Sequence, residues 1–262
     1  RNLPQNMPSA RRVERDMAGL WRATASAIRE VLAASASDPA DIAAVAATAH
    51  GDGLYLLDAA GAPLGSGILS LDSRTAPLVE NWRAAGLHEQ SLRRTGQEPH
   101  VSAPSAILAW IRDQEPDRYA RIGHVLTCKD GLRFWLAGTI GTDRTEASTS
   151  FTDVRTQTYS TEALALFGLS DLARALPEAS HSAEIVGTVT AEAADATGLR
   201  QGTPVAAGLH DVTASALGVG AHRVGVIGMV AGTYSINACV STRMLEQYGD
   251  LAGFNDELRL VS

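Results

Sequence analysis

The hydrophobic and polar positions of the chain follow two patterns, one with helical spacing and one of short continuous apolar runs. Between residues 16 and 35 apolar side chains recur every three to four positions, which predicts a surface helix that begins after an N-cap at Asp16 and covers a sheet. The run of small apolar residues from Ile42 to Ala49 instead predicts a central strand covered on both faces. The stripe of the predicted helix comprises Met17, Leu20, Trp21, Ile28, Val31 and Leu32.

Further strands and helices alternate along the rest of the chain. Short apolar runs predict strands at residues 54–58, 66–70, 124–127, 184–189, 204–207, 224–230 and 236–241. Helical spacing, caps and helix-ending glycines predict helices at residues 75–85, 105–112, 131–137, 160–167, 191–197 and 212–220. Strands that alternate with helices indicate an α/β fold, and one domain is the simplest division because no repeat or linker interrupts the pattern.

Composition and charge narrow the class of protein. The chain has 262 residues, of which 45% are hydrophobic and only 5% aromatic, so its core is expected to be aliphatic and rich in alanine. The 29 acidic and 22 basic residues give a net charge of −7, which argues against nucleic acid as a principal ligand. No apolar run reaches the ~18 residues of a membrane span, residues 1–15 lack the apolar core of a signal peptide, and two cysteines form no disulfide framework. A cytoplasmic globular protein is expected.

Several common catalytic signatures are missing from the sequence. It contains no HExxH, CxxC, GxxxxGK[ST] or GxSxG pattern, so no residue is assigned as a metal ligand and the commonest hydrolase reading is excluded. Gly218, Gly220 and Gly225 fail the GxGxxG spacing and fall at a helix end, which argues against a dinucleotide site.

The sharpest chemical feature is the GLHD turn at residues 208–211, between a predicted strand and a predicted helix. Ligands of open α/β sheets bind at such strand ends, and a helix N-terminus stabilises an ionised carboxylate. The carboxylate of Asp211 could therefore accept a proton from a substrate hydroxyl. The alternative is that Asp211 only caps the helix.

Three other polar segments could bind a ligand. The Gly-Thr-Tyr-Ser turn at residues 232–235 offers backbone N–H groups and hydroxyls to phosphate oxygens, and the alternative is an ordinary hairpin. In the HGDG loop at residues 50–53, the carboxylate of Asp52 lies between glycines and could accept two vicinal hydroxyls, and the alternative is a solvated turn. Asp72 and Arg74 follow in sequence, with an exposed surface ion pair as the alternative.

Taken in order, these segments resemble the FGGY carbohydrate kinases, which share the ribonuclease H-like (actin, hexokinase) ATPase fold. The resemblance implies an α/β lobe with a mixed sheet flanked by helices, and it runs through nearly the whole chain. It is carried by VERDMAGLW at residues 13–21, by AHGDG and the stretch that follows it at 49–75, by residues 115–148, by the stretch around GLHD at 202–221, and by AGTYS at 231–235.

The resemblance also implies roles for individual residues. Asp211 would remove the proton from the acceptor hydroxyl, and ATP and Mg²⁺ would be the cofactors. The implied phosphate-binding residues are Gly232, Thr233 and Ser235, and the implied sugar- or polyol-binding residues are His50, Asp52, Asp72, Arg74 and His210. Asp143 and Ser148 lie in the segment that follows the helix predicted at residues 131–137, and they are interpreted as structural.

The substrate loop separates this chain from the commonest pattern of the family. Many xylulose kinases carry Gln-Met-His-Gly where this chain has residues 50–53, and an acidic Asp52 is similar to glycerol and polyol kinases. The stretch at residues 56–74 looks closest to L-xylulose/3-keto-L-gulonate kinases, with erythritol- and glycerol-type kinases next. The expected function is therefore ATP-dependent phosphorylation of a hydroxyl of a small ketose or polyol.

The family also has two parts that this sequence does not contain. One is an opening β-hairpin with a phosphate-binding Asp-x-Gly-Thr turn, and the other is a second lobe that binds adenine and ribose. Residues 1–262 are therefore expected to form an N-terminal lobe that alone is inactive, or, as an alternative of another class, a sugar-binding lobe without catalysis. An actin-like scaffold would not need both the HGDG and GLHD turns. The expected partner is a small sugar or polyol, neither nucleic acid nor a membrane, and a homodimer is left open.

Overall fold

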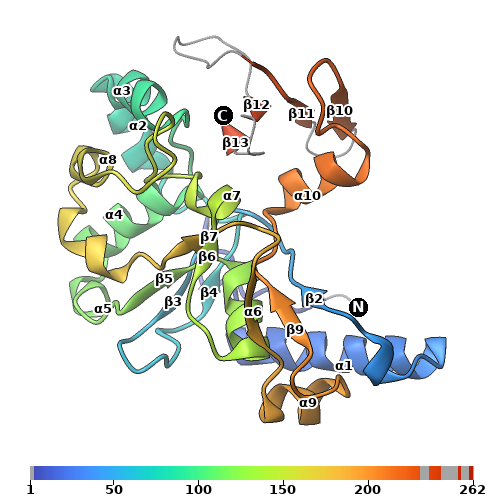
Figure 1. The fold of residues 1–262 in the computed structure, drawn as a ribbon. Helices are drawn as coiled ribbons and strands as arrows, with labels where there is room; N and C mark the ends of the chain where they lie inside the picture. Colours follow the sequence, from blue (N-terminus) through green and yellow to red (C-terminus); the bar gives the residue numbers. More distant parts are fainter. Residues whose placement is uncertain (1–2, 231–235, 243–252, 255–259, 262) are drawn as a thin grey trace.

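A computed structural model describes residues 3–230, 236–242, 253–254 and 260–261 of the chain. Short strands and α6 lie in the middle of this part, with α4 and α8 to one side and α1 and α9 to the other (Figure 1). The described helices are α1 (Met17–Ser35), α2 (Ala76–Ala84), α3 (Leu87–Thr95), α4 (Pro104–Gln114), α5 (Pro116–Tyr119), α6 (Cys128–Ala137), α7 (Arg144–Ala147), α8 (Thr161–Leu166), α9 (Ala191–Thr197) and α10 (Asp211–Gly218), with short 3₁₀ turns at Pro39–Asp41 and Ser170–Ala175.

The strands pair in both directions, which confirms the mixed α/β architecture. In the three-stranded sheet, β9 lies between a parallel β2 and an antiparallel β8, while β3 pairs with β5 and β6 with β7. The described strands are β1 (Glu14–Arg15), β2 (Val45–Ala46), β3 (Tyr55–Leu57), β4 (Gly67–Ile68), β5 (His124–Leu126), β6 (Thr142–Asp143), β7 (Ala179–Ser180), β8 (Ile185–Thr188), β9 (Pro204–Ala206), β10 (Ile227–Val230), β11 (Ile236–Cys239), β12 (Gly253–Phe254) and β13 (Leu260–Val261).

The prediction of a central, doubly covered strand at Ile42–Ala49 is wrong. Only Val45 and Ala46 form a strand, and β2 lies at the edge of its sheet, where Ala46 is exposed. Alanine side chains have little apolar area to bury, so an alanine-rich run occurs at the edge of a sheet as well as at its centre. Apolar character alone therefore does not show how many strands pair with this one. Strand β2 instead pairs in parallel with β9, with Val45 opposite Val205, so both strands end at the same side of the sheet.

Helix α1 begins as predicted, because the Asp16 side chain accepts hydrogen bonds from the backbone N–H groups of Ala18 and Gly19. The helix packs against α9, and Trp21, Ile28 and Leu32 contact the buried cluster around Val205. Val31 is 66% exposed, so its place in the predicted stripe is wrong.

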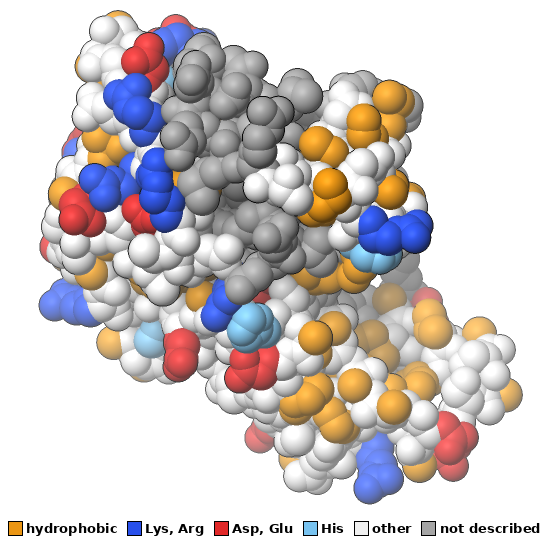
Figure 2. Space-filling view, turned by 45° about the horizontal axis from the view of Figure 1, so that its top comes forward, with side chains coloured by type: hydrophobic (Ala, Val, Ile, Leu, Met, Phe, Trp, Pro, Cys, Tyr) orange, Lys and Arg blue, Asp and Glu red, His pale blue; other side chains and the backbone are white. Residues whose placement is uncertain are grey.

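The largest hydrophobic cluster lies between the strands and α4. Ile107, Leu108 and Ile111 of α4 are fully buried and belong to one hydrophobic cluster with Leu54 and Val125. Helix α3, which the sequence pattern did not predict, has a charged exterior and packs against α8. Exposed large hydrophobic side chains gather on the part of the surface formed by α10 and β10 (Figure 2), namely Leu217, Val219, Val224, Ile227 and Met229. Within the described ranges, no helix is long and apolar enough to span a membrane.

Candidate functional site

The GLHD turn connects β9 to α10 and brings Asp211 to the start of that helix. His210 is the N-cap residue, since its Nδ1 accepts a hydrogen bond from the backbone N–H of Val212. Asp211 is the first residue of the helix, and its Oδ1 also accepts a hydrogen bond from the backbone N–H of Val212 at 2.7 Å, so its carboxylate takes part in capping the helix. The Asp211 side chain is 44% exposed, and its Oδ1 lies 3.1 Å from His210 Nδ1. A half-exposed carboxylate at a helix N-terminus is well placed to meet a substrate hydroxyl.

Two glycines let the turns of this site approach closely. Gly208 has a φ of +85°, and a Cβ there would lie 2.1 Å from the carbonyl oxygen of Ala47, just after β2. A Cβ on Gly51 would lie only 1.8 Å from Nε2 of His210. The HGDG loop and the GLHD turn, predicted separately from the sequence, are therefore in direct contact through Gly51 and the His210 ring.

Asp52 occupies the left-handed region, with a φ of +57°, and projects beside a histidine that the sequence reasoning missed. His100 Nε2 lies 3.4 Å from Asp52 Oδ1. Burial alone would raise the pKa of Asp52, but the hydrogen bond to His100 and the nearby His210 and His50 hold that pKa below its ordinary value. Asp52 thus remains a carboxylate that can accept hydroxyl donors.

His100 is held in place by its neighbour in sequence. Its Nδ1 lies 3.3 Å from the hydroxyl of Ser102, whose backbone carbonyl accepts a hydrogen bond from Gly53. Burial lowers the pKa of His100, and the contact with Asp52 outweighs this, so the pKa is raised. The sequence around His100 carries no turn motif, and its proximity to Asp52 depends on a contact between distant segments.

His50 lies at the other end of the HGDG loop. Its Nε2 is 3.3 Å from the hydroxyl of Tyr55, and burial lowers its pKa, with nearby Asp211 and Asp52 acting in the opposite direction. A neutral imidazole can both donate and accept hydrogen bonds, which suits a polyhydroxylated ligand.

Asp72 and Arg74 form a buried ion pair rather than an exposed one. Arg74 Nε and Nη2 donate to the two carboxylate oxygens of Asp72 at 2.9 and 2.8 Å, and Nη2 also contacts Glu14 at 2.7 Å. Asp72 is 0% exposed, and its Oδ2 accepts from the backbone N–H of Val13. The surface-pair alternative is therefore wrong. The charged groups of this pair bind each other and the β1 segment, and their implied role in substrate binding stays a prediction.

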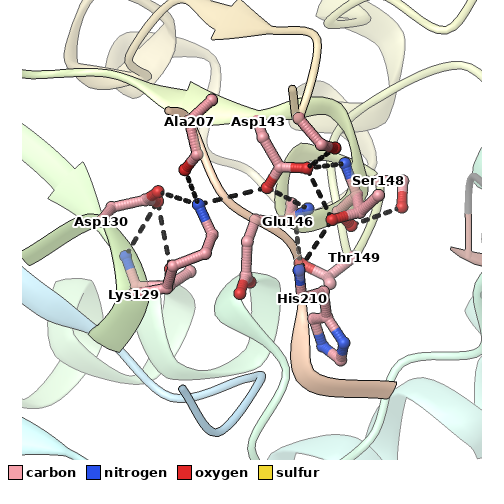
Figure 3. A network of polar contacts seen from close by, with 11 residues as sticks. Lys129, Asp130, Asp143, Glu146, Ser148, Thr149, Ala207 and His210 are labelled. Carbon is pink, nitrogen blue, oxygen red and sulfur yellow. Dashed lines mark hydrogen bonds and ion pairs between the residues drawn. The ribbon is translucent and has the colours of Figure 1, made fainter. Parts of the chain in front are cut away.

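A cluster of buried charged side chains lies beside the GLHD turn (Figure 3). Lys129, Asp130, Asp143 and Glu146 are all at least 98% buried. Burial raises the pKa of Glu146 well above its ordinary value; Lys129 opposes the rise, and Asp130, Asp143 and Asp52 add to it. Both carboxyl oxygens of Glu146 lack a hydrogen-bond partner among the described residues, and in Figure 3 its carboxyl points away from Asp143. A neutral Glu146 is the form that this environment favours.

The predicted phosphate-binding residues Gly232, Thr233 and Ser235 lie outside the described residues. Across the described part of the chain, no three His, Cys, Asp or Glu side chains are arranged to hold a metal ion. ATP and Mg²⁺ therefore stay predictions from the resemblance. The described site combines a half-exposed carboxylate at Asp211 with acceptors and histidines at His50, Asp52 and His100, a set that can bind a polyhydroxylated ligand and remove one of its protons.

Comparison with known proteins gives the same picture. The chain is 37% identical over 235 residues to a probable L-xylulose kinase of Pasteurella multocida, covering 89% of the chain and 49% of that protein. It is 35% identical to the L-xylulose/3-keto-L-gulonate kinase of Escherichia coli, covering 87% of the chain and 46% of that protein. It is 32% identical to an erythritol kinase of Brucella abortus, covering 79% of the chain and 40% of that protein. The chain thus spans about half the length of the curated relatives it matches.

Solved structures share the fold. The crystal structure of a xylulose kinase from Rhodospirillum rubrum superposes with a TM-score of 0.80 at 31% identity, covering 87% of this chain and 47% of the other. The family model for the N-terminal domain of the FGGY carbohydrate kinases matches residues 1–218, which include β9, the GLHD turn and α10. The chain is therefore a member of the FGGY family of carbohydrate kinases.

Proposed function

We propose that the protein is a cytoplasmic ATP-dependent carbohydrate kinase that phosphorylates a hydroxyl of a small ketose or polyol, and that residues 1–262 form its N-terminal lobe. The observation that carries this proposal is the contact between two turns. Asp211 stands half exposed at the start of α10, and the His210 ring beside it packs directly on Gly51 of the HGDG loop. A proton acceptor and a set of hydroxyl-binding groups therefore meet at one place.

In the proposed reaction, the substrate hydroxyl oxygen forms a bond to phosphorus while the bond between phosphorus and the leaving oxygen breaks. Asp211 accepts the hydroxyl proton, and ATP, when bound, supplies the phosphoryl group. Such transfers depend on positioning more than on covalent chemistry, so the place of Asp211 at the start of α10 matters as well as its ability to accept a proton.

The HGDG loop would select the substrate. Asp52, kept ionised beside His100, would accept hydrogen bonds from vicinal hydroxyls, and His50 would donate or accept one more. The relatives named for L-xylulose and 3-keto-L-gulonate support a substrate of that kind, and the relative named for erythritol supports a polyol as the alternative.

The test is a pair of asparagine variants, made in the protein produced with any sequence that flanks these 262 residues in its gene. Asp211→Asn should lower kcat by at least about 100-fold, the usual contribution of a general base. Asp16→Asn removes a carboxylate from the start of another helix, α1, and should leave kcat unchanged. Turnover by Asp211→Asn at the parent rate would show that Asp211 is not the base.

The substrate is found by screening L-xylulose, 3-keto-L-gulonate, erythritol, ribitol and glycerol with ATP. Calorimetry of the 262-residue chain with the same compounds, and with ATP, tests the alternative of a sugar-binding lobe without catalysis. If the 262-residue chain binds one of the sugars or polyols, and the protein produced with its flanking sequence turns ATP over with none of them, the binding alternative is supported and the kinase proposal is refuted.

A further inference from the structure

We propose that a buried network centred on Asp143 positions Asp211, with the Thr145 hydroxyl as its link to the GLHD turn. From the sequence, Asp143 is interpreted only as structural. The inference rests on the proposed function, since it concerns how the base of that reaction is held in place.

Asp143 is fully buried at the end of β6 and collects donors from three segments (Figure 3). Its Oδ1 lies 3.2 Å from Lys129 Nζ in α6. Its Oδ2 accepts from the backbone N–H of Thr145 at 3.0 Å, from the Thr145 hydroxyl at 2.6 Å and from the Ser182 hydroxyl at 2.7 Å. Hydrogen bonds to an ionised acceptor are among the stronger ones in proteins, so these donors are held in fixed positions.

The same three donor residues hold the backbone just before Asp211. Lys129 Nζ donates to the carbonyl of Ala207 at 3.2 Å, and the carbonyl of Ser182 accepts from the N–H of Gly208 at 3.0 Å. The N–H of His210 donates to the Thr145 hydroxyl oxygen at 2.9 Å. Polar contacts from Lys129, Ser182 and Thr145 therefore reach the backbone along most of the segment that leads into α10.

The direction of the Thr145 hydroxyl is decided by Asp143. Its single proton is donated to the Asp143 carboxylate, so the oxygen has only lone pairs left to offer, and these receive the His210 N–H. His210 is also the N-cap of α10. The hydroxyl therefore sets where the helix begins, and with it the place of Asp211.

The electrostatics of the network make this arrangement stiff. Lys129 is 0% exposed and lies 2.6 Å from Asp130 Oδ1 as well as near Asp143. Burial alone would lower the pKa of Lys129, but the carboxylates of Asp130 and Asp143 raise it. Removing one partner of a buried charge pair is strongly destabilising, so the ion pairs resist opening. A turn fixed to such a frame keeps its carboxylate in one position, and reaction rates fall steeply when a reacting group moves by about 1 Å.

The kinetic test compares three variants in the same protein. Thr145→Val keeps the shape of the side chain but removes the hydroxyl, and it should lower kcat about 10- to 100-fold while KM for the sugar changes less than about threefold. Thr145→Ser keeps the hydroxyl and should restore kcat. Thr149→Val is the matched control. It removes the hydroxyl of another buried threonine, which lies just after α7 and donates to the Glu146 carbonyl rather than to the GLHD turn. Equal kcat values for Thr145→Val and Thr149→Val would overturn the proposal.

Amide hydrogen exchange provides a readout that does not depend on activity. In Thr145→Val the His210 amide should exchange at least about tenfold faster than in the parent, and in Thr149→Val it should not. If the parent shows no kinase activity but the His210 amide responds in this way, the proposed function fails while the network stands. If the amide is unaffected, the network proposal fails whatever the activity. Should Thr145→Val not fold, Ser182→Ala, which removes one donor to Asp143, carries the same two measurements.

Discussion

Gly51→Ala should distort the site because the His210 ring occupies the space that a Cβ would need. The added carbon would lie 1.8 Å from Nε2, 2.3 Å from Cε1 and 2.6 Å from Cδ2 of that ring. Ordinary contacts between such atoms are about 3.5–4.0 Å, so the ring must move by more than 1 Å or the loop must shift. His210 is 3% exposed, which leaves the ring no open space to enter.

The expected cost follows from this overlap. Forcing extra atoms into a packed site typically costs about 1–3 kcal/mol of unfolding free energy. When His210→Ala has removed the ring, the same Gly51→Ala change should cost less than about 0.5 kcal/mol, the size of an ordinary surface substitution. The coupling free energy of the double-mutant cycle should therefore be about 0.5–3 kcal/mol.

Urea unfolding of the four proteins, followed by circular dichroism, measures each term of the cycle. Gly218→Ala is the control, because a Cβ at this last residue of α10 meets nothing within 4 Å, and it should be neutral or stabilising by at most about 1 kcal/mol. Additive effects of Gly51→Ala and His210→Ala would refute the contact between the two turns. Gly51→Ala should also lower kcat, since the displaced ring is the N-cap beside Asp211.

Three further predictions concern buried groups. Because the pKa of Glu146 is raised, the folded chain loses stability as pH rises above the ordinary glutamate pKa of about 4.3. The Tm of Glu146→Gln minus the Tm of the parent should therefore be larger at pH 8 than at pH 4. An equal difference at the two pH values would contradict this prediction. Arg74→Met should cost about 3–5 kcal/mol in urea unfolding by leaving Asp72 buried and unpaired, and adding Asp72→Asn should recover part of that loss; no recovery would count against the pair. Burial raises the pKa of Cys128 to about 11, so iodoacetamide at pH 8 should label it in urea but not in the folded chain, as mass spectrometry would show.

Local signals in the sequence predicted the elements that depend on local chemistry. Asp16 caps α1, Thr190 caps α9, and Gly198 ends that helix in the left-handed region, each as its residue type indicates. The strand predicted at residues 54–58 contains β3 (Tyr55–Leu57), and its continuous apolar run reflects burial of successive side chains. The two turns of the site were also visible from the sequence, because glycine and aspartate are informative at strand ends.

Features that depend on long-range contacts could not be read in this way. His100 reaches Asp52 from a segment almost 50 residues later, and no spacing rule relates the two. Asp143 gave no sign that it gathers donors from α6 and from Ser182, since charged residues in a sequence are expected at the surface unless a partner is known. The edge position of β2 likewise depends on which strands pair with it, which an alanine-rich run does not specify.

Lys129 is the only lysine in the 262 residues, and its side chain is completely buried. Amine-directed chemistry along this chain, such as acylation of lysine, reductive methylation or cleavage by a lysine-specific protease, therefore has a single side-chain target that is shielded while the core is closed. Modification at Lys129 would report the opening of the α6 region, because these 262 residues offer no other lysine side chain. Lys129, which donates a hydrogen bond to the segment leading to Asp211, is thus also a chemical probe of local unfolding.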